Sequence, residues 1–287
     1  MIKTILASLT GYGSDRSALD AAVALARLDG GHVHCLHTHM AILDASAWNA
    51  YARPEQHHDL HKLSQQIAAE QAERLRHARE AFDSACVRHA LVVQDAPSEA
   101  AVSIAWQETE THINQTLHEA RYHDVAVMAR EENLSVERIE SVLMQSGRPL
   151  LLAPPKPVTV IGRKVAIAWK PSAESARAVT AATAILSRAE QVTILSVSEN
   201  GADDDTGRAS AEHLAGQLKW HGVNARVGVE ASPSGSAAEA LKDMAYNCDA
   251  DLLVMGGYGH SRVREFVFGG VTRDILADCA LPVLMVR

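Results

Sequence analysis

Glycine is concentrated near the end of the chain, in the segment 256–272, which reads G-G-Y-G-H-S-R-V-R-E-F-V-F-G-G-V-T. Apolar residues 252–255 precede this segment and predict a buried strand, and residues 272–277 predict the start of a helix. Glycine permits positive φ and leaves no Cβ in the path of a ligand. The N–H groups and the dipole of a helix N-terminus attract anions. The segment therefore predicts a site for a phosphate-bearing ligand.

Charged and polar side chains inside the segment can reinforce an anion site. Arg262 or Arg264 can pair with a phosphate, since a guanidinium binds an oxyanion through two parallel hydrogen bonds. The alternative for each arginine is a solvated side chain or an ion pair with Glu265. His260 can donate to a phosphate, although a single loop histidine more often has no such role.

The strands and helices that would hold this segment occur twice along the chain. Each half begins with an apolar strand, a serine-containing helix start and an alanine-rich helix. A proline-rich stretch at 154–157, P-P-K-P, can continue neither a strand ladder nor a helix. We therefore expect two domains, at residues 1–154 and 162–287. The matching strands are 5–9 and 165–169, 32–38 and 192–198, 125–128 and 252–255, and 149–153 and 282–286.

Apolar strands alternate with helical patterns within each half. This alternation predicts an α/β fold in which helices cover a mainly parallel sheet. In the second half the predicted helices are 172–188, 209–221 and 236–246, with a further strand at 225–230. Ligands of such sheets bind beyond the carboxyl ends of the strands. The glycine segment follows the strand 252–255 and is therefore expected at that edge.

The two halves differ at this segment. From Met128 to Pro149 is 21 positions, whereas from Met255 to Pro282 is 27. The first-half counterpart, 129–137, contains no glycine. It carries three glutamates, Glu131, Glu132 and Glu137. Because carboxylates repel phosphate, we expect the first half to lack the site.

The repeat and the glycine spacing together resemble the universal stress protein family in its tandem, two-domain form. Nucleotide-binding members of that family carry G-x-x-G, nine residues, and then G followed by Ser or Thr, between the fourth strand and the last helix. Gly256 and Gly259 match the first pair, and Gly269 follows after nine residues. Gly270 stands where the hydroxyl residue is usual. Each half of the chain resembles one family domain.

This resemblance implies two Rossmann-like domains, each a five-stranded, mainly parallel sheet with helices on both faces. It also implies that the second half binds ATP or a related adenine nucleotide, with an accompanying Mg²⁺ left open. The ribose would lie near Met255 and Gly256, and the adenine at the backbone of Val197. Together with residues singled out for their own charge or position, the predicted site comprises Trp169, Lys170, Val197, Met255, Gly256, Gly259, His260, Arg262, Gly269, Gly270, Val271 and Thr272.

One position departs from the family pattern. The first strand of the family usually ends in an aspartate near the nucleoside, whereas this chain has Trp169 and Lys170 there. Lys170 can reach a phosphate as a cation or stay solvated. Loss of the acid leaves open a different nucleotide preference or weaker binding.

Histidine offers a second kind of chemistry in the first half. His32 with His34, and His37 with His39, project in pairs from one predicted strand. Such pairs could ligate zinc if a histidine of the insert 57–61 supplied a third ligand. The sequence holds no C-x-x-C or H-E-x-x-H pattern to complete a site. Polar strand residues and an alanine-rich surface loop are the favoured interpretation.

Composition and charge narrow the class of protein further. A formal net charge of −8 argues against a general binder of nucleic acid or of anionic membranes. The four cysteines form no C-x-x-C pair, and no apolar run is long enough for a signal peptide or a membrane span. We therefore expect a cytoplasmic protein with no nucleic-acid and no membrane partner.

The predicted function is that of a stress-response protein whose second half binds an adenine nucleotide. The first half would be a non-binding partner, and the family resemblance implies that the halves dock as an intramolecular pseudo-dimer through 149–153 and 282–286. A homodimer of two chains stays open. Spacing places no catalytic constellation, so any ATP hydrolysis should be slow. Two alternatives remain, a nucleotide-free scaffold and an enzyme acting on an adenylated substrate. For the enzyme, 10–17 (T-G-Y-G-S-D-R-S) only loosely resembles the S-G-G-x-D-S loop of ATP pyrophosphatases.

Overall fold

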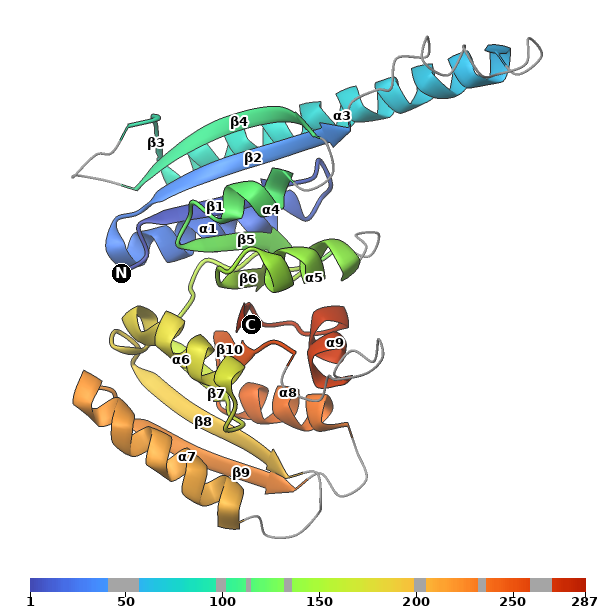
Figure 1. Cartoon of the computed structure of the whole chain (residues 1–287). Coiled ribbons are helices and arrows are strands. Elements are labelled where there is room, and N and C mark those ends of the chain that lie inside the picture. The colour runs from blue at the N-terminus through green and yellow to red at the C-terminus, as the bar shows by residue number, and fades with distance from the viewer. Residues whose placement is uncertain are drawn as a thin grey trace.

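The fold is one continuous sheet with helices on both faces. A computed structural model describes residues 1–40, 57–96, 102–111, 115–131, 136–198, 205–231, 236–258 and 270–287. The strands of these residues form a sheet of 11 strands. The first half of the chain forms one end of the sheet and the second half forms the other (Figure 1). The prediction of an α/β fold with a mainly parallel sheet is confirmed.

Strands and helices alternate along both halves. The first half contains β1 (Thr4–Leu9), α1 (Asp15–Asp29), β2 (His32–Met40), α3 (His57–His89), β3 (Val92–Val93), β4 (Ser103–Thr111), α4 (Gln115–Ala120), β5 (Val125–Ala129), α5 (Val136–Gln145) and β6 (Leu150–Ala153). The second half contains β7 (Lys164–Ala168), α6 (Ala173–Leu186), β8 (Gln191–Ser198), α7 (Asp205–Leu218), the 3₁₀ helix η2 (Lys219–His221), β9 (Ala225–Ala231), α8 (Ala237–Asn247), β10 (Leu252–Gly256), α9 (Gly270–Ala277) and β11 (Val283–Val286). Serine marks a helix start as expected, since Oγ of Ser172 accepts the N–H of Ser175 at 3.2 Å and caps α6.

The two halves join through their proline-led strands. The strand order is β3-β4-β2-β1-β5-β6-β11-β10-β7-β8-β9. β6 and β11 pair antiparallel, with Leu151 opposite Leu284, and the other described pairings are parallel. The pairing implied by the family resemblance is therefore present. The second half has the expected five strands, whereas the two-residue β3 adds a sixth, at the edge of the first half.

Strand registers identify the equivalent positions of the two halves. β2 pairs with β1, and β8 with β7, in the same register, so Thr38 corresponds to Val197. β5 and β10 each pair with the last strand of their own half, so Ala129 corresponds to Gly256. The carboxyl edges of the two halves can therefore be compared position by position.

Apolar side chains cover both faces of the sheet. In β7, Val165 and Ile167 join a cluster with α1, α6 and α7. Ala166 and Ala168, which point the other way, join a second cluster with α5, α8 and α9. Both clusters contain residues of both halves. A parallel sheet buried on both faces needs nearly continuous apolar strands, and β5 accordingly reads V-A-V-M-A.

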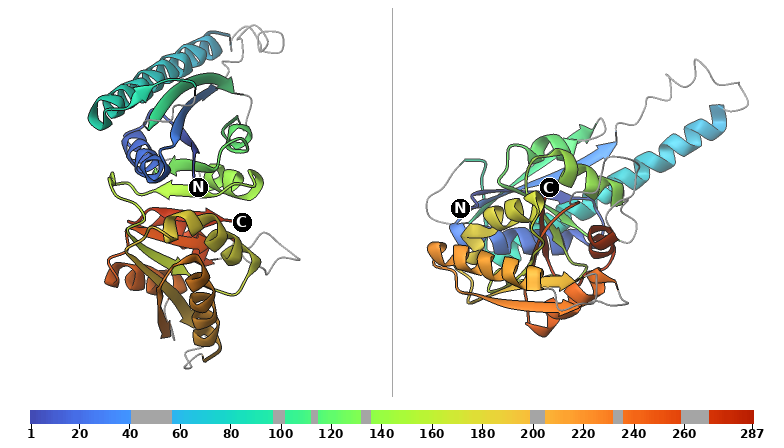
Figure 2. Two further views of the ribbon diagram at one scale, coloured as in Figure 1. Left: turned by 90° about the vertical axis from the view of Figure 1, so that its left-hand side faces the viewer. Right: turned by 60° about the horizontal axis from the view of Figure 1, so that its bottom comes forward.

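The helix α3 is longer than any helix that the structure describes in the second half. It begins at His57, so the insert 57–61 belongs to a helix and the expectation of a surface loop was wrong. The start of α3 projects away from the sheet (Figures 1 and 2). Its exposed surface carries ion pairs such as Arg74 with Glu70, at 2.6 Å. Among the helices that the structure describes, none is long and apolar enough to cross a membrane.

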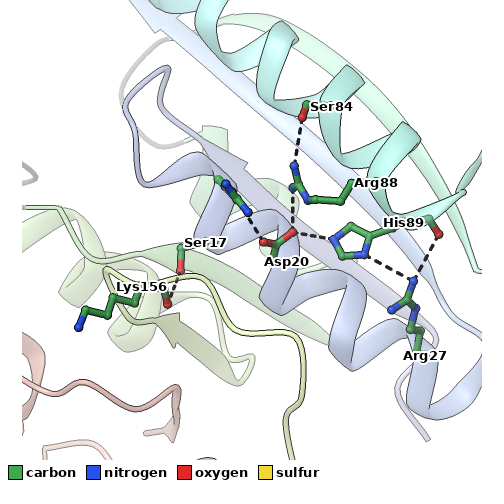
Figure 3. Close-up of polar contacts among 8 residues, drawn as sticks. Ser17, Asp20, Arg27, Ser84, Arg88, His89 and Lys156 are labelled. Carbon is green, nitrogen blue, oxygen red and sulfur yellow. Dashed lines mark hydrogen bonds and ion pairs between the residues drawn. The ribbon is translucent and has the colours of Figure 1, made fainter.

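A buried carboxylate attaches the other end of α3 to α1. The side chain of Asp20 is only 2% exposed and lies between Arg88 and His89 (Figure 3). Its Oδ1 lies 2.8 Å from Nη2 of Arg88 and 2.6 Å from Nε2 of His89. Arg27 in turn donates to the carbonyl of His89 at 3.3 Å. Paired and hydrogen-bonded, the carboxylate can stay buried and hold the helix in place.

Candidate functional site

The two ends of the glycine segment lie together at the carboxyl edge of the second half. β10 ends at Gly256, and α9 begins at Gly270. The N–H of Tyr258 donates to Oγ1 of Thr272 at 3.3 Å and so connects the strand end to the first turn of α9. The intervening residues 259–269 lie outside the described part of the chain. They include Gly259, His260, Arg262 and Gly269 of the predicted site.

The glycines of the segment that the structure describes differ in how closely other residues approach them. A Cβ on Gly256 would lie 2.6 Å from the backbone nitrogen of Ser175, in the first turn of α6. A Cβ on Gly257 would lie 2.9 Å from Cδ2 of Leu143 on α5. A Cβ on Gly270, by contrast, would have no atom of the described residues within 4 Å. The first two glycines therefore allow elements to pack closely, whereas the described residues leave space beside Gly270.

Three apolar residues of the predicted site share one face of the sheet. Met255 is buried, and Val197 and Val271 pack against the same cluster. Val197 and Met255 come from the ends of β8 and β10, and Val271 comes from the first turn of α9. The structure therefore brings these residues to one side of the carboxyl edge, beside the helix start.

Trp169 and Lys170 directly follow β7, but the side chain of Trp169 does not join the apolar group of Val197, Met255 and Val271. The indole Nε1 of Trp169 donates to Oγ of Ser210 on α7 at 3.0 Å, and the ring packs against the cluster of the opposite face. Its backbone N–H donates to the carbonyl of Leu195 at 2.8 Å and continues the pairing of β7 with β8. Lys170 is exposed. The side chain of Trp169 therefore faces α7, away from Val197.

The equivalent edge of the first half is filled by polar side chains of the chain itself. Oε1 of Glu131 accepts hydrogen bonds from the hydroxyls of Thr10 and Ser14. The carboxylate of Asp15 accepts the N–H groups of Thr10 and Gly11, both at 2.8 Å. Asp15 is 1% exposed, and burial raises its pKa to about 6, against the lowering effect of those backbone hydrogen bonds.

An arginine completes this filling from the last helix of the first half. Arg138 stands eleven positions before Pro149, as Val271 stands eleven before Pro282. Its Nη2 donates to three hydroxyls from three elements: Oγ of Ser8 at 3.4 Å, Oγ1 of Thr38 at 3.2 Å and Oγ1 of Thr116 at 3.1 Å. One guanidinium therefore lies against the ends of β1 and β2, where the second half has valine.

Opposite charges balance at this first-half edge. Burial lowers the pKa of the Arg138 guanidinium, and the carboxylates of Glu131 and Asp15 act in the opposite direction. The sequence predicts that the first half lacks a site, because glycine is missing there and glutamates repel phosphate. The structure adds that Glu131 is engaged by hydroxyl groups and is accompanied by a cation.

The half that carries the glycine segment is similar in sequence to known proteins. A model described as the universal stress protein family matches residues 162–287. A universal stress protein of Synechocystis sp. is 42% identical over 53 residues, which span 18% of this chain and 18% of that relative. Residues 162–287 therefore resemble the universal stress protein family in sequence. The resemblance stated from the sequence is confirmed.

Solved structures extend the likeness in fold to the whole chain. A universal stress protein of Archaeoglobus fulgidus superposes with a TM-score of 0.65 at 15% identity, over 99% of this chain and 98% of that one. A Pseudomonas aeruginosa protein described as a putative universal stress protein gives a TM-score of 0.58 at 15% identity, over 99% of this chain and 93% of that one. At such identity the likeness concerns the fold, and it covers both halves.

Arg130 attaches the first half to the family-matched half. It follows β5 directly and is the counterpart of Gly257, since the two N–H groups donate equivalently to the last strands, at 3.0 and 2.8 Å. The Arg130 side chain is buried and reaches the C-terminal end of α9. It donates to the carbonyls of Ile275 at 2.8 Å, Leu276 at 2.7 Å and Cys279. A cation at this end also complements the helix dipole.

Tyr258 forms a second connection between the halves. Its hydroxyl donates to Oε1 of Glu140 on α5 at 2.5 Å. Sequence reasoning missed Tyr258, Glu140, Arg130 and Arg138. The available signal was the contrast between Arg130 and Gly257, a charged residue and a glycine at the same place after a buried strand.

The first-half histidines have partners within the protein. Nδ1 of His34 lies 3.1 Å from Nε2 of His123, Nδ1 of His32 lies 2.9 Å from Oγ of Ser103, and Nδ1 of His37 lies 3.2 Å from the carbonyl of Leu9. Burial lowers the pKa of His32, His34 and His37. Across the described residues, no group of three histidine, cysteine or acidic side chains is placed to hold a metal ion. The side chains of His57, His58 and His61 fall outside those residues.

Proposed function

We propose that the second half binds an adenine nucleotide, ATP or a relative of it, with the phosphates at the glycine segment and the start of α9. The observation that carries the proposal is the hydrogen bond of 3.3 Å between Tyr258 and Thr272, which stand 14 positions apart. The ends of the segment between them meet at one point of the carboxyl edge. Backbone N–H groups and the dipole of α9 favour an anion there.

The described residues around this point support a nucleotide. Val197, Met255 and Val271 give an apolar wall beside the helix start, which suits a base and a ribose. Gly270 opens α9 with room for a ligand, as far as the described residues reach. Oγ1 of Thr272 accepts from Tyr258 and keeps its own proton to donate. The proposal assigns no nucleotide contact to the indole of Trp169, because that ring faces α7.

The proposed site occurs once in the chain. In the first half, Arg138, Glu131 and Asp15 occupy the equivalent edge with hydrogen bonds of their own. We propose that residues 1–154 and 162–287 are two domains of one stress-response protein acting in the cytoplasm, the first of which binds no nucleotide. Mg²⁺ would enter as a counter-ion of the phosphates. Main-chain binding of this kind holds ground and transition states alike, so any ATP hydrolysis is slow.

Calorimetry with ATP, ADP and AMP tests the proposal, together with mass spectrometry of small molecules released from freshly purified protein. We expect binding of at least one adenine nucleotide. An absence of bound nucleotide and of binding heat at millimolar ligand would contradict the proposal and favour the scaffold alternative. Release of pyrophosphate or AMP at turnover rates would favour the adenylate enzyme instead.

A matched pair of changes at Gly270 tests the location of the site. Gly270→Ser restores the hydroxyl usual in the family, and Gly270→Asp places a carboxylate at the same point. Both side chains suit a helix start, so the melting temperature should not fall. We expect the serine variant to bind ATP at least as tightly as the wild type. The aspartate variant should bind about tenfold more weakly or worse, a change of about 1.4 kcal/mol. Equal affinities for the two variants would place the phosphates elsewhere.

A further inference from the structure

Tyr258 has a rare backbone conformation just before the undescribed part of the glycine segment. Its φ of +54° lies in the left-handed region, which non-glycine residues seldom adopt. Its side chain is buried, only 6% exposed, in the apolar cluster that contains residues of both halves. Such a conformation persists where the surroundings hold it in place.

Two hydrogen bonds hold Tyr258 from opposite sides. Its N–H donates to Oγ1 of Thr272, within the family-matched half. Its hydroxyl donates at 2.5 Å to Oε1 of Glu140, which lies 118 positions earlier on α5 of the first half. A carboxylate acceptor makes this second bond one of the stronger kinds in proteins. Tyr258 therefore links the strand end, the helix start and the other half of the molecule.

Further contacts with the first half hold the residues around Tyr258 and the helix α9 in place. Gly257 brings the backbone against α5, since a Cβ there would lie 2.9 Å from Cδ2 of Leu143. Arg130 of the first half holds the far end of α9 through the carbonyls of Ile275 and Leu276, at 2.8 and 2.7 Å. The first half therefore contacts this unit at both ends: at the residues before the glycine segment and at the last turn of α9.

We infer that Tyr258 is a positioning residue of the nucleotide site and that Glu140 of the first half sets its position. The effect on affinity rests on the proposed function, whereas the effect on the ligand-free protein does not. Glu140 acts through Tyr258, and Tyr258 acts through the bond that brings the start of α9 to the strand end. A site arranged before the ligand arrives needs less ordering on binding, which strengthens affinity. The half without a site thereby contributes to binding in the other half.

Removal of the hydroxyl and of its acceptor tests this inference. Tyr258→Phe keeps the ring and loses the bond, and Glu140→Ala removes the acceptor. Glu137→Ala is the matched control, since Glu137 lies exposed on the same helix. The first measurement is hydrogen–deuterium exchange of the ligand-free protein, in peptides that contain Tyr258 and Thr272. The second is the ATP dissociation constant of each variant.

We expect Tyr258→Phe and Glu140→Ala to raise exchange at Tyr258 and Thr272 severalfold and to weaken ATP binding about tenfold, the range of one charge-assisted hydrogen bond. The double variant should be no worse than either single variant, and Glu137→Ala should match the wild type. Exchange at the wild-type level in both single variants would overturn the inference, as would unchanged affinity. If the wild type bound no ATP, the proposed function would fail, while raised exchange would still support the positioning role of Glu140.

Discussion

The two halves build the same carboxyl edge from the same elements and fill it with different chemistry. In the second half, Val197, Val271 and Gly270 surround the edge with apolar groups and backbone. In the first half, Arg138 and Glu131 reach into the equivalent space and bond to hydroxyl groups there. Arg138 stands where the second half has Val271, and Glu131 stands where it has Tyr258. Both charged side chains find hydrogen-bond partners within the chain. The first half of the repeat therefore fills this edge with internal contacts.

The residues after β5 and β10 show a second difference. Arg130 is a long cation that bonds to α9, whereas its counterpart Gly257 has no side chain and rests against α5. Each half thus contacts the last helix of the other. Arg130 bonds to α9 through its charge, and Gly257 packs closely against α5. Glycine in a glycine-rich segment can consequently serve the joining of two halves as well as a ligand.

Arg130→Ala breaks the charged side of this joint and should have the largest effect. The change removes charge-assisted hydrogen bonds to buried carbonyls at the end of α9, and we expect the free energy of unfolding to fall by about 3 kcal/mol. Urea denaturation measures it. Arg148→Ala is the matched control, because half-buried Arg148 also donates to a backbone carbonyl, that of Arg121 at 2.9 Å. A loss for Arg130→Ala no greater than for the control would mean that the joint does not depend on this cation.

Gly256→Ala tests whether this glycine serves packing. Its Cβ would meet Ser175 and Glu174 at 2.6–2.9 Å, so we expect a loss of about 2 kcal/mol in stability. The equivalent first-half position holds Ala129, and Ala129→Gly should lose only about 1 kcal/mol, through backbone entropy and a lost methyl contact. Thermal melting of both variants checks the contrast. An unchanged melting temperature for Gly256→Ala would contradict the packing role and favour a role of Gly256 in ligand binding.

Asp15 gives the first-half edge a pH dependence. The equivalent position, directly after the cap of α6, is Ala173, which does not titrate. The folded pKa of about 6 exceeds the ordinary value of 3.8, so the protonated carboxyl favours folding. That contribution is complete below about pH 4 and is lost as pH rises through 6. Relative to Asp15→Asn, the wild type should lose about 1–2 kcal/mol of stability between pH 4.5 and 7.5. Urea denaturation across this range checks it, with exposed Asp243→Asn as a control that should leave the slope unchanged.

The sequence allowed the repeat and the α/β class to be predicted, because both rest on local patterns, and the family resemblance implied the joining strands. Runs such as 252–255 are apolar throughout, and proline marks the same strand in both halves. The helical state of 57–61 was missed, because its histidines and polar neighbours show little apolar periodicity. The packing of α3 on α1 depends on Asp20, whose partners stand 68 and 69 positions away.

The candidate site could be predicted only in outline. Gly256 and Gly270 are the same residue type in one segment, and only the distance to α6 separates a packing glycine from an open one. Nothing in the sequence singled out Arg138, yet it bonds to β1, β2 and α4. Tyr258 carried no signal, because its partner Glu140 lies in the other half. Contacts between distant segments decide these roles, and spacing along the chain does not contain them.

The number of nucleotides bound per chain tests the central claim most directly. Calorimetric titration of the wild type, Gly270→Asp and Arg138→Leu with ATP gives both the stoichiometry and the half responsible. We predict one ATP per wild-type chain, binding weakened at least tenfold in Gly270→Asp, and one ATP per chain still bound by folded Arg138→Leu. Two nucleotides per wild-type chain, or binding indifferent to Gly270→Asp, would contradict a single site in the second half.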